Sequence, residues 1–346
     1  MRARAVIGAN FGDEGKGLVT DYLASTGGDV VVRFNGGCQA GHTVVTPEGQ
    51  RHVFSHFGSG SFVGLPTFFS QHTIINPVLF LKELADIKHL GVSFKVYIHP
   101  DARVTTPWDM NKNQDLEVAR LIGKIGGVGD IRHGSCGVGI FETIKRNKKI
   151  PLLMTDLCTS RKKLARQIDI IREHYSALED DHLTIKFITD CVKFVDIVEV
   201  ADIYKFKDPI FEGAQGLLLD QGNLDMYPHL TPSRCGMHNV RELCFERGIQ
   251  NIDSYYISRT YLTRHGVGPL PGEFKTLKYK DQTNVENEWQ GPLRFGVLHA
   301  RKLLHRIHAD CHNPHLVLTH CDQRPPEFFS TFYSYGETRE SISYRP

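Results

Sequence analysis

Gly8-Ala9-Asn10-Phe11-Gly12-Asp13-Glu14-Gly15-Lys16-Gly17 is the stretch that decides the fold. It follows the apolar run Ala5-Val6-Ile7, which predicts a buried strand, and precedes residues 18–23, whose apolar positions have helical spacing. A strand, a glycine-rich turn and a helix together make a phosphate-binding layout, because backbone N–H groups and the helix N-terminus face the anion and Lys16 adds a charge. The spacing is not that of a Walker A loop.

An acidic pair distinguishes this turn from an ordinary phosphate-binding loop. The carboxylates of Asp13 and Glu14 would repel phosphates unless one of them holds Mg²⁺ or moves a proton. A second β-branched run, residues 30–34, leads into another glycine-rich turn that ends at His42. Two such turns in succession, carrying Asp, Lys and His, indicate a site that does chemistry on phosphates.

Composition is that of an ordinary globular protein. The 346 residues can bury a large core, as one α/β domain or two smaller ones. A net charge of +2 gives no general attraction to nucleic acid, and we expect no nucleic-acid partner. The eight cysteines form no C-x-x-C pair, which fits free thiols in a reducing cytoplasm. The N-terminus enters a strand at once and no apolar run approaches ~18 residues, so we expect no signal peptide and no membrane span.

Strands and helices alternate along the chain. Residues 53–57, 73–75 and 94–98 are strand-like, and residues 77–84 form an amphipathic pattern with Pro77 in the first helical turn. This alternation predicts a mostly parallel sheet covered by helices. There is no internal repeat or linker, so we predict a single α/β domain over residues 1–346.

Five stretches resemble one known family. Residues 12–17 read G-D-E-G-K-G and residues 39–43 read Q-A-G-H-T, where the adenylosuccinate synthetase family has G-D-E-G-K-G and N-A-G-H-T. Three later matches follow in the family's order: Phe211–Gly216 with Tyr227-Pro228 and Thr231, then Thr263–Pro269, then Leu318–Asp322. The resemblance implies that family's P-loop-like fold with long active-site loops. It also implies its activity, which joins aspartate to a purine nucleotide with a nucleoside triphosphate.

The implied reaction has two steps. The purine 6-oxygen is phosphorylated, and the aspartate amine then displaces that phosphate. The resemblance places Asp13 as the base at N1, His42 as the proton donor near the transferring group, and Lys16 as the cation that spreads its charge. Mg²⁺ would lie against Asp13 and the Gly41 carbonyl.

The resemblance also assigns binding residues. The nucleoside triphosphate would be bound by Gly12, Glu14, Gly15, Lys16, Gly17, Gly41, Thr43, Asp322, Ser334 and Gly336. The monophosphate would be bound by Asn10, Asp13, Gln39, Ser135, Cys136, Arg146, Gln215, Thr231 and Arg264. Aspartate would be bound by Arg294, Gly291 and Gln290.

Arg146 carries the expectation of a dimer. It lies where the family places an arginine that reaches the neighbouring subunit's monophosphate, and the resemblance therefore implies a homodimer with shared sites. The alternative interpretation is a solvated charge within the basic run 145–149.

The aspartate loop departs from the family's pattern. The family has T-T-G-R-R-R-R, and this chain has Trp289-Gln290-Gly291-Pro292-Leu293-Arg294. The arginine that clamps aspartate falls on Arg294, but the one that touches the ribose 2′-hydroxyl falls on Pro292, which has no side-chain donor. This favours a deoxynucleotide and the short phage branch, which converts dGMP to a succinylated 2-aminoadenine nucleotide. Asp13 argues the other way, because phage-type enzymes often carry a smaller residue there.

The phosphate donor stays open at this point. Asp322 lies where the family reads guanine, which favours GTP, whereas the phage branch uses an adenine nucleotide such as ATP or dATP. His320 stands in place of the family's Lys, and Ser334-Tyr335-Gly336-Glu337 resembles its terminal S-T-G-P with Glu for Pro. Two alternatives remain: an ordinary synthetase that uses IMP, aspartate and GTP, and a nucleotide-binding regulator without ligase activity.

Overall fold

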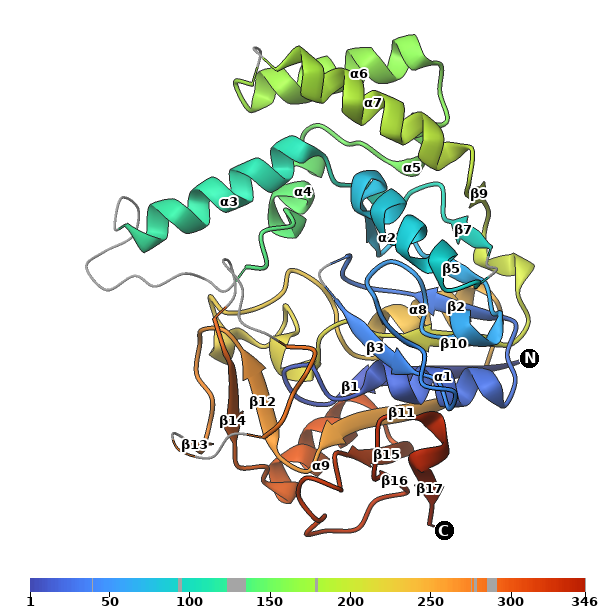
Figure 1. Ribbon diagram of the computed structural model, residues 1–346, viewed down its shortest axis with the longest axis vertical. Coiled ribbons are helices and arrows are strands. Elements are labelled where there is room, and N and C mark those ends of the chain that lie inside the picture. The colour runs from blue at the N-terminus through green and yellow to red at the C-terminus, as the bar shows by residue number, and fades with distance from the viewer. Residues whose placement is uncertain are drawn as a thin grey trace.

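A large twisted sheet runs through the centre of the molecule (Figure 1). The computed structural model describes residues 1–38, 40–92, 95–122, 135–177, 180–274, 276, 279–284 and 291–345. Ten strands form this sheet in the order β17-β16-β15-β11-β1-β10-β2-β5-β7-β9. All its neighbouring pairs are parallel except β16 with β17. The predicted α/β class with a mostly parallel central sheet is confirmed.

The strands of this sheet are short and mostly buried. Their bounds are β1 Arg2–Gly8, β2 Val30–Arg33, β5 Thr67–Phe69, β7 Val96–Ile98, β9 Glu199–Val200, β10 Pro209–Glu212, β11 Asn251–Arg259, β15 Pro314–Thr319, β16 Phe332–Ser334 and β17 Ile342–Tyr344. Three smaller sheets lie beside it, formed by β3 His42–Val45 with β4 Arg51–Phe54, β6 Ile74–Ile75 with β8 Arg103–Val104, and β12 Leu262–His265 with β13 Glu273–Phe274 and β14 Leu293–Gly296.

Helices cover both faces of the sheet. Their bounds are α1 Lys16–Ser25, α2 Pro77–His89, α3 Pro107–Leu121, α4 Ile140–Asn147, α5 Met154–Leu157, α6 Arg161–His174, α7 Asp181–Val195, α8 His238–Glu246 and α9 Ala300–Asp310. Helix α2 begins as predicted at Pro77, where the Asn76 side chain accepts hydrogen bonds from Val78 N and Leu79 N. None of the helices in the described ranges is long and apolar enough to cross a membrane.

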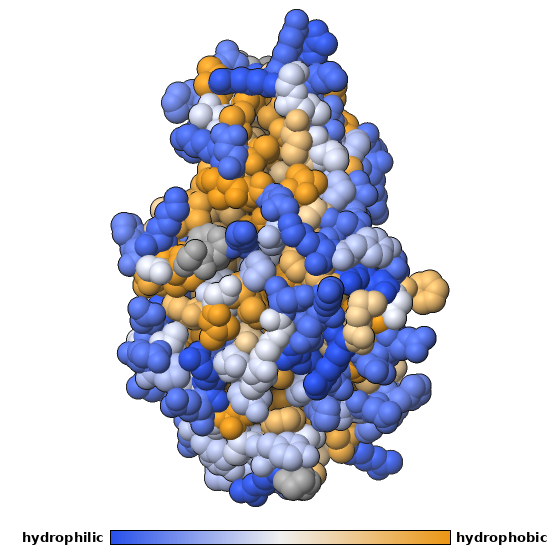
Figure 2. Space-filling model, turned by 90° about the vertical axis from the view of Figure 1, so that its right-hand side faces the viewer, coloured by the Kyte–Doolittle hydropathy of each residue, from blue (hydrophilic) through white to orange (hydrophobic). Residues whose placement is uncertain are grey.

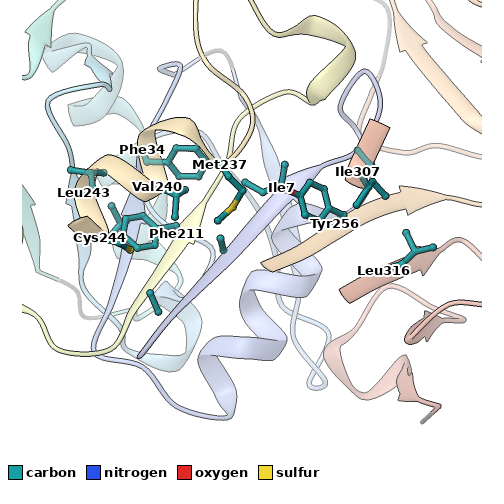
Figure 3. Packing of buried hydrophobic residues seen from close by; sticks show 14 of the residues in the cluster. Ile7, Phe34, Phe211, Met237, Val240, Leu243, Cys244, Tyr256, Ile307 and Leu316 are labelled. Carbon is teal, nitrogen blue, oxygen red and sulfur yellow. The ribbon is translucent and has the colours of Figure 1, made fainter. Parts of the chain in front are cut away.

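Alternation along β1 distributes its side chains between two cores. Ala3, Ala5 and Ile7 face α8 and α9, and Figure 3 shows Ile7 beside Met237 and Tyr256 in this cluster. Val6 faces the opposite side, where it packs with α1. Burial on both faces explains why β1 reads as a continuous apolar run.

A second core lies under α2, α5, α6 and α7, away from the phosphate-binding turn. Figure 1 shows α6 and α7 as the outermost layer at the top of the molecule. Figure 2 shows hydrophobic side chains gathered in this upper part, where the exposed large apolar residues are Ile170, Ile185, Val192, Ile197 and Val200.

The carboxyl ends of the parallel strands meet at one edge of the central sheet. The glycine-rich turn follows β1, Gly213 follows β10, and Arg259 and Thr319 end β11 and β15. In open α/β sheets this edge is where ligands bind. The fold therefore brings the far-separated sequence motifs to one place.

Candidate active site

A cavity of about 1150 Å³ opens at this edge of the sheet. The turn after β1, the β3–β4 hairpin, α3, α4 and residues 280–284 contribute to its wall. A space of this size exceeds what one small ligand needs and suits several bound together.

The glycine-rich turn forms one wall as a phosphate-binding cradle. Gly12 and Gly15 have φ of 101° and 94°, which only glycine adopts without strain. A Cβ on Gly17 would lie 2.6 Å from the Thr43 carbonyl oxygen, so glycine also allows the two turns to approach. Helix α1 begins here without a side-chain cap, which leaves its first N–H groups available to an anion.

Glu14 and Lys16 form a buried pair within the cradle. Lys16 Nζ lies 3.7 Å from Glu14 Oε2, and both side chains are almost fully buried. Burial raises the pKa of Glu14 to about 7, although Lys16 and the Asn10 N–H oppose the rise. Glu14 therefore sits under the cradle as a carboxyl that is readily protonated, which reduces its repulsion of phosphates.

Asp13 projects its carboxylate into the cavity from a left-handed backbone conformation with φ of 57°. Its backbone carbonyl accepts a hydrogen bond from Arg259 Nε at 2.5 Å. Among the described residues, no side chain or N–H group donates a hydrogen bond to its carboxylate. A free carboxylate beside a phosphate site fits Mg²⁺, which is usually bound by one or two carboxylates together with substrate phosphates. The Gly41 backbone, which also lines the cavity, can supply the carbonyl ligand.

His42 is held by a carboxylate that sequence reasoning did not assign. His42 Nδ1 lies 2.7 Å from Glu212 Oε1, and both side chains are buried. Ser59 donates to the same carboxylate through its hydroxyl and its backbone N–H, and Arg33 Nη1 lies 3.7 Å away. The Nε2 atom of His42 has no hydrogen-bond partner among the residues that the structure describes, and the ring lines the cavity.

The protonation of this pair follows from its burial. Burial lowers the pKa of His42 to about 4, although the Glu212 carboxylate opposes this. Burial alone would raise the pKa of Glu212, but His42 and Arg33 outweigh it and lower that pKa to about 2. The imidazole is thus neutral near pH 7, with Nδ1–H donating to Glu212 and Nε2 free to exchange a proton with a ligand.

Six of the residues predicted for the monophosphate line the cavity: Asp13, Ser135, Cys136, Gln215, Thr231 and Arg264. Gln215 has φ of 57°, and its Oε1 is buried with no hydrogen-bond partner in the described part of the chain. Burial raises the pKa of Cys136 to about 11, so its thiol is neutral. An unpartnered amide and a neutral thiol are groups that a purine or phosphate can engage by hydrogen bonds.

Arg264 and Arg294 lie directly opposite each other on β12 and β14. Arg264 faces the cavity, packs over the Phe11 ring and donates to three backbone carbonyls. Burial and the neighbouring Arg294 lower the pKa of Arg264 to about 10. Arg294 donates to the Gly268 carbonyl at 2.5 Å and pairs with Glu273 at 3.1 Å, outside the cavity lining. Two adjacent cations would be stabilised by an anion between them, and the clamp on aspartate stays a prediction.

The predicted triphosphate residues mostly line the same cavity. Gly12, Glu14, Gly15, Lys16, Gly17, Gly41, Thr43, Asp322 and Gly336 all contribute to its wall. Ser334 does not; its hydroxyl donates to the Gly336 carbonyl and so supports that turn from behind. Arg339 pairs with the buried Asp21 of α1 at 3.1 Å and ties the same C-terminal segment to the cradle helix.

Arg146 requires a correction. Its guanidinium is buried and bonded to Asp109, to the Val104 carbonyl at 2.7 Å and to the Ile150 carbonyl at 2.8 Å. The solvated-charge interpretation is wrong, and the chain itself occupies the groups expected to reach a neighbouring subunit. The basic run 145–149 misled the sequence interpretation, because it gave no sign of the partner Asp109, which is 37 positions away.

Two predicted residues, Asn10 and Gly291, lie off the cavity wall. Asn10 lies behind the cradle, where its amide donates to Ser258 Oγ at 2.9 Å and accepts from Arg306. Gly291 packs near Gly266 rather than on the cavity wall. Gln39 and Gln290 lie outside the described residues.

Glu212, Arg259 and Asp281 are the residues of the site that sequence reasoning missed. Glu212 stood inside a matched motif, and its place at the end of a buried strand was an available signal. Arg259 and Asp281 form a buried ion pair at 2.7 Å across 22 positions, and no local pattern marks such a pair.

Comparison with known proteins identifies the family. The adenylosuccinate synthetase family model matches residues 5–322. The chain belongs to the adenylosuccinate synthetase family. It is 33% identical over 296 residues to the enzyme of that name from Microcystis aeruginosa, covering 78% of this chain and 62% of the relative. It is 30% identical over 339 residues to the Thermoplasma acidophilum enzyme, covering 89% of this chain and 73% of the relative. The match thus spans less than two thirds of the Microcystis protein.

Two solved synthetase structures share the fold over the whole chain. The fully ligated adenylosuccinate synthetase of Plasmodium falciparum superposes with a TM-score of 0.76 at 19% identity, covering 100% of this chain and 87% of that one. The succinoaminodeoxyadenylate synthetase PurZ of cyanophage S-2L, bound to dGMP and dATP as an energy donor, superposes with a TM-score of 0.68 at 18% identity. This superposition covers 100% of the present chain and 95% of the phage protein. At these identities the likeness establishes the fold.

Proposed function

We propose that this chain is a ligase that joins L-aspartate to C6 of a purine nucleoside monophosphate through a 6-phosphoryl intermediate. The observation that carries the proposal is the convergence of Asp13 and His42 on one cavity beside a phosphate-binding cradle. Binding alone needs no base and no acid. The pair therefore argues against a nucleotide-binding regulator without ligase activity.

The chemistry assigns each side chain a task. Asp13 takes the proton from N1 of the purine, so that negative charge develops on O6. O6 attacks the terminal phosphorus of the triphosphate, the bond to the bridging oxygen breaks, and Lys16 and the cradle N–H groups stabilise the moving charge. His42 acts here as the imidazolium, which the anionic phosphates beside Nε2 favour once they are bound: Nε2–H then donates to the transferring oxygens, while Nδ1–H stays on Glu212, which fixes the ring. The aspartate amine then attacks C6 and inorganic phosphate leaves.

Mg²⁺ fits this arrangement and would be held by Asp13 and the Gly41 carbonyl together with substrate oxygens. It would neutralise charge on the transferring phosphoryl group.

The substrate we favour is dGMP, giving 2-amino-2′-deoxyadenylosuccinate, the precursor of diaminopurine in DNA. Pro292 is exposed in the turn before β14 and has no side-chain donor for a 2′-hydroxyl. The phage relative of the same fold was solved with dGMP and dATP, which makes ATP or dATP the donor in this proposal.

The ordinary reaction of IMP, aspartate and GTP is the alternative, and a specific observation supports it. Asp322, the residue that would read guanine, lines the cavity. The relatives from Microcystis aeruginosa and Thermoplasma acidophilum are also both named adenylosuccinate synthetase.

We further propose a homodimer. Exposed apolar side chains lie on α3 and α4, two helices that contribute to the cavity wall, and a second copy would cover them: Val118, Leu121 and Phe141. Light scattering of the purified protein tests this proposal, and a monomeric mass at micromolar concentration would reject it.

A substrate panel tests the function. IMP, dIMP, GMP and dGMP are each incubated with aspartate, Mg²⁺ and either ATP, dATP or GTP, and succinyl products are detected by mass. We expect product from dGMP with an adenine donor. The preference over GMP should be modest, about 1–3 kcal/mol, because a site without a partner for the 2′-hydroxyl no longer selects ribose but does not exclude it. Product from IMP with GTP, and none from dGMP, would leave the ordinary synthetase.

A further inference from the structure

Arg259 connects two parts of the site that the reaction uses at different steps. It is the last residue of β11, and its side chain is buried against the cradle. Its Nε donates to the Asp13 carbonyl at 2.5 Å, its Nη1 to Tyr261 Oη at 3.2 Å, and its Nη2 to Asp281 Oδ2 at 2.7 Å. Each of the three nitrogens thus has a partner within the chain, so these contacts fix the position of the guanidinium, which also lines the cavity.

Asp281 organises residues 279–284, which cover part of the cavity. Its Oδ1 accepts hydrogen bonds from Thr283 N at 2.9 Å and Asn284 N at 2.8 Å. Thr283 Oγ1 in turn lies 2.9 Å from Thr43 Oγ1 and accepts from Arg51 at 2.8 Å, on the hairpin that carries His42. The segment is therefore fixed at both ends: to Arg259 and to the β3–β4 hairpin.

The aromatic residues beside Arg259 strengthen the same connection. Tyr279 stacks on Tyr261 with ring centroids 3.8 Å apart and an interplanar angle of 10°. Tyr261 donates to Gln323 Oε1 at 2.7 Å, and Gln323 donates to the Lys280 carbonyl at 3.1 Å. Tyr261 leads directly into β12, the strand that carries Arg264 opposite Arg294.

We propose that Arg259 is a positioning residue. Through its contact with the Asp13 carbonyl and its ion pair with Asp281, it fixes the position of Asp13 relative to the small sheet that carries Arg264 and Arg294. The proposal rests on the proposed function, since it concerns where the base and the aspartate cations lie. Asp13 has a left-handed backbone, which an L-residue adopts only when its surroundings hold it. The guanidinium supplies that restraint on one side and orders residues 279–284 on the other. A small displacement of a catalytic group reduces turnover strongly.

The test compares Arg259→Met, Arg259→Lys, Asp281→Asn and the double variant Arg259→Met/Asp281→Asn. Arg4→Met is the matched control, because Arg4 is also a buried arginine with an ion pair, to Asp208, but lies away from the cavity. All are assayed with the monophosphate that wild type uses, at a temperature where circular dichroism shows each to be folded.

We expect Arg259→Met to lower kcat about 10²-fold. Asp281→Asn should lower kcat about tenfold and raise KM for aspartate, while KM for the triphosphate stays within about threefold. The double variant should be no worse than Arg259→Met, because both act through one pair. Arg259→Lys should recover only part of the loss, since an ammonium cannot make the forked contacts.

The outcomes separate the inference from the function. If wild type turns over a monophosphate and these variants behave like Arg4→Met, or the two losses add in the double variant, the positioning role is wrong and the ligase stands. If wild type turns over none of the four monophosphates, the proposed function and the positioning role fall together.

Discussion

His42–Glu212 and His56–Glu83 are two buried histidine–carboxylate pairs within the described ranges, and of these two only the first faces the cavity. His42 and Glu212 lie 2.7 Å apart at the carboxyl edge of the central sheet, and the free Nε2 of His42 belongs to a ring on the cavity wall. His56 and Glu83 lie 3.1 Å apart in the second core, where the His56 ring packs against Phe69 and Phe80. The same pairing thus presents a nitrogen to the cavity at the edge of the sheet, where we propose a catalytic role, and stabilises the structure inside a core.

The surroundings of the carboxylates explain this difference. Glu83 accepts hydrogen bonds from the backbone N–H groups of Ser55 and His56, so it fastens the chain after β4 to α2. Glu212 is bound by Ser59 and Arg33, and the Nε2 atom of His42 stays available to a ligand. Position relative to the sheet edge, rather than residue type, therefore distinguishes the two roles.

The largest effect is expected at the cavity itself. His42→Asn and Asp13→Asn should each lower kcat by roughly 10²–10⁴-fold, because each removes a proton-transfer group with little change in volume. Nucleotide binding, measured by calorimetry, should persist. His56→Asn is the matched control and should leave kcat within about threefold. Near-wild-type turnover in either cavity variant would remove its assigned role.

The two carboxylates give the next contrast. Glu212→Gln should lower kcat about 10²-fold, because the neutral amide no longer fixes the Nδ1–H tautomer of His42. Glu83→Gln should leave kcat intact and lower the free energy of unfolding by about 1–3 kcal/mol, through weaker bonds to buried donors. Urea melts and steady-state kinetics on both variants check this, and equal effects on kcat would abolish the distinction.

Acid stability sharpens the structural half of the comparison. Burial alone would raise the pKa of Glu83, but His52 and His56 outweigh it and lower that pKa to about 2 from 4.5. A carboxyl with a lowered folded-state pKa contributes stability that is present above pH 4.5 and is lost as the pH falls toward about 2. We expect roughly 2–3 kcal/mol of acid-dependent stability from this group. A melting series from pH 5 to 2.5 should show a shallower slope for Glu83→Gln; an unchanged slope would contradict the assignment.

The smallest effect is expected for the two arginines of β12 and β14, which extend the comparison from carboxylates to cations. Arg294→Leu should raise KM for aspartate about 10- to 100-fold through loss of a charge-assisted carboxylate contact. The triphosphate KM serves as the internal control and should not change. If the aspartate KM is unaltered, Arg264, the neighbour that lines the cavity, becomes the clamp.

Much of the fold was predictable because its signals are local. The run Ala5–Ile7, the cradle glycines and the capped start of α2 at Pro77 each carry their own physical reason. The cradle, His42 and Asp322 were predicted for the same reason, because each lies within a contiguous sequence motif. The ion pairs of Arg146 and Arg259 were not, because their partners Asp109 and Asp281 are brought near only in the folded chain. The sequence also places Pro292 where the family has the arginine that touches the ribose 2′-hydroxyl. The effect of this difference on substrate choice depends on how the nucleotide binds, which the sequence does not describe.

The fate of the purine 6-oxygen tests the central claim most directly. Monophosphate labelled with ¹⁸O at C6, whichever of the panel the wild type uses, is incubated with aspartate, Mg²⁺ and the donor, and the released phosphate is analysed by mass. The account predicts one ¹⁸O in each phosphate released, dependent on aspartate, with release greatly slowed in Asp13→Asn. Phosphate without the label, or label-free release that does not need aspartate, would mean that water rather than the purine receives the phosphoryl group, and the ligase mechanism proposed for this cavity would be wrong.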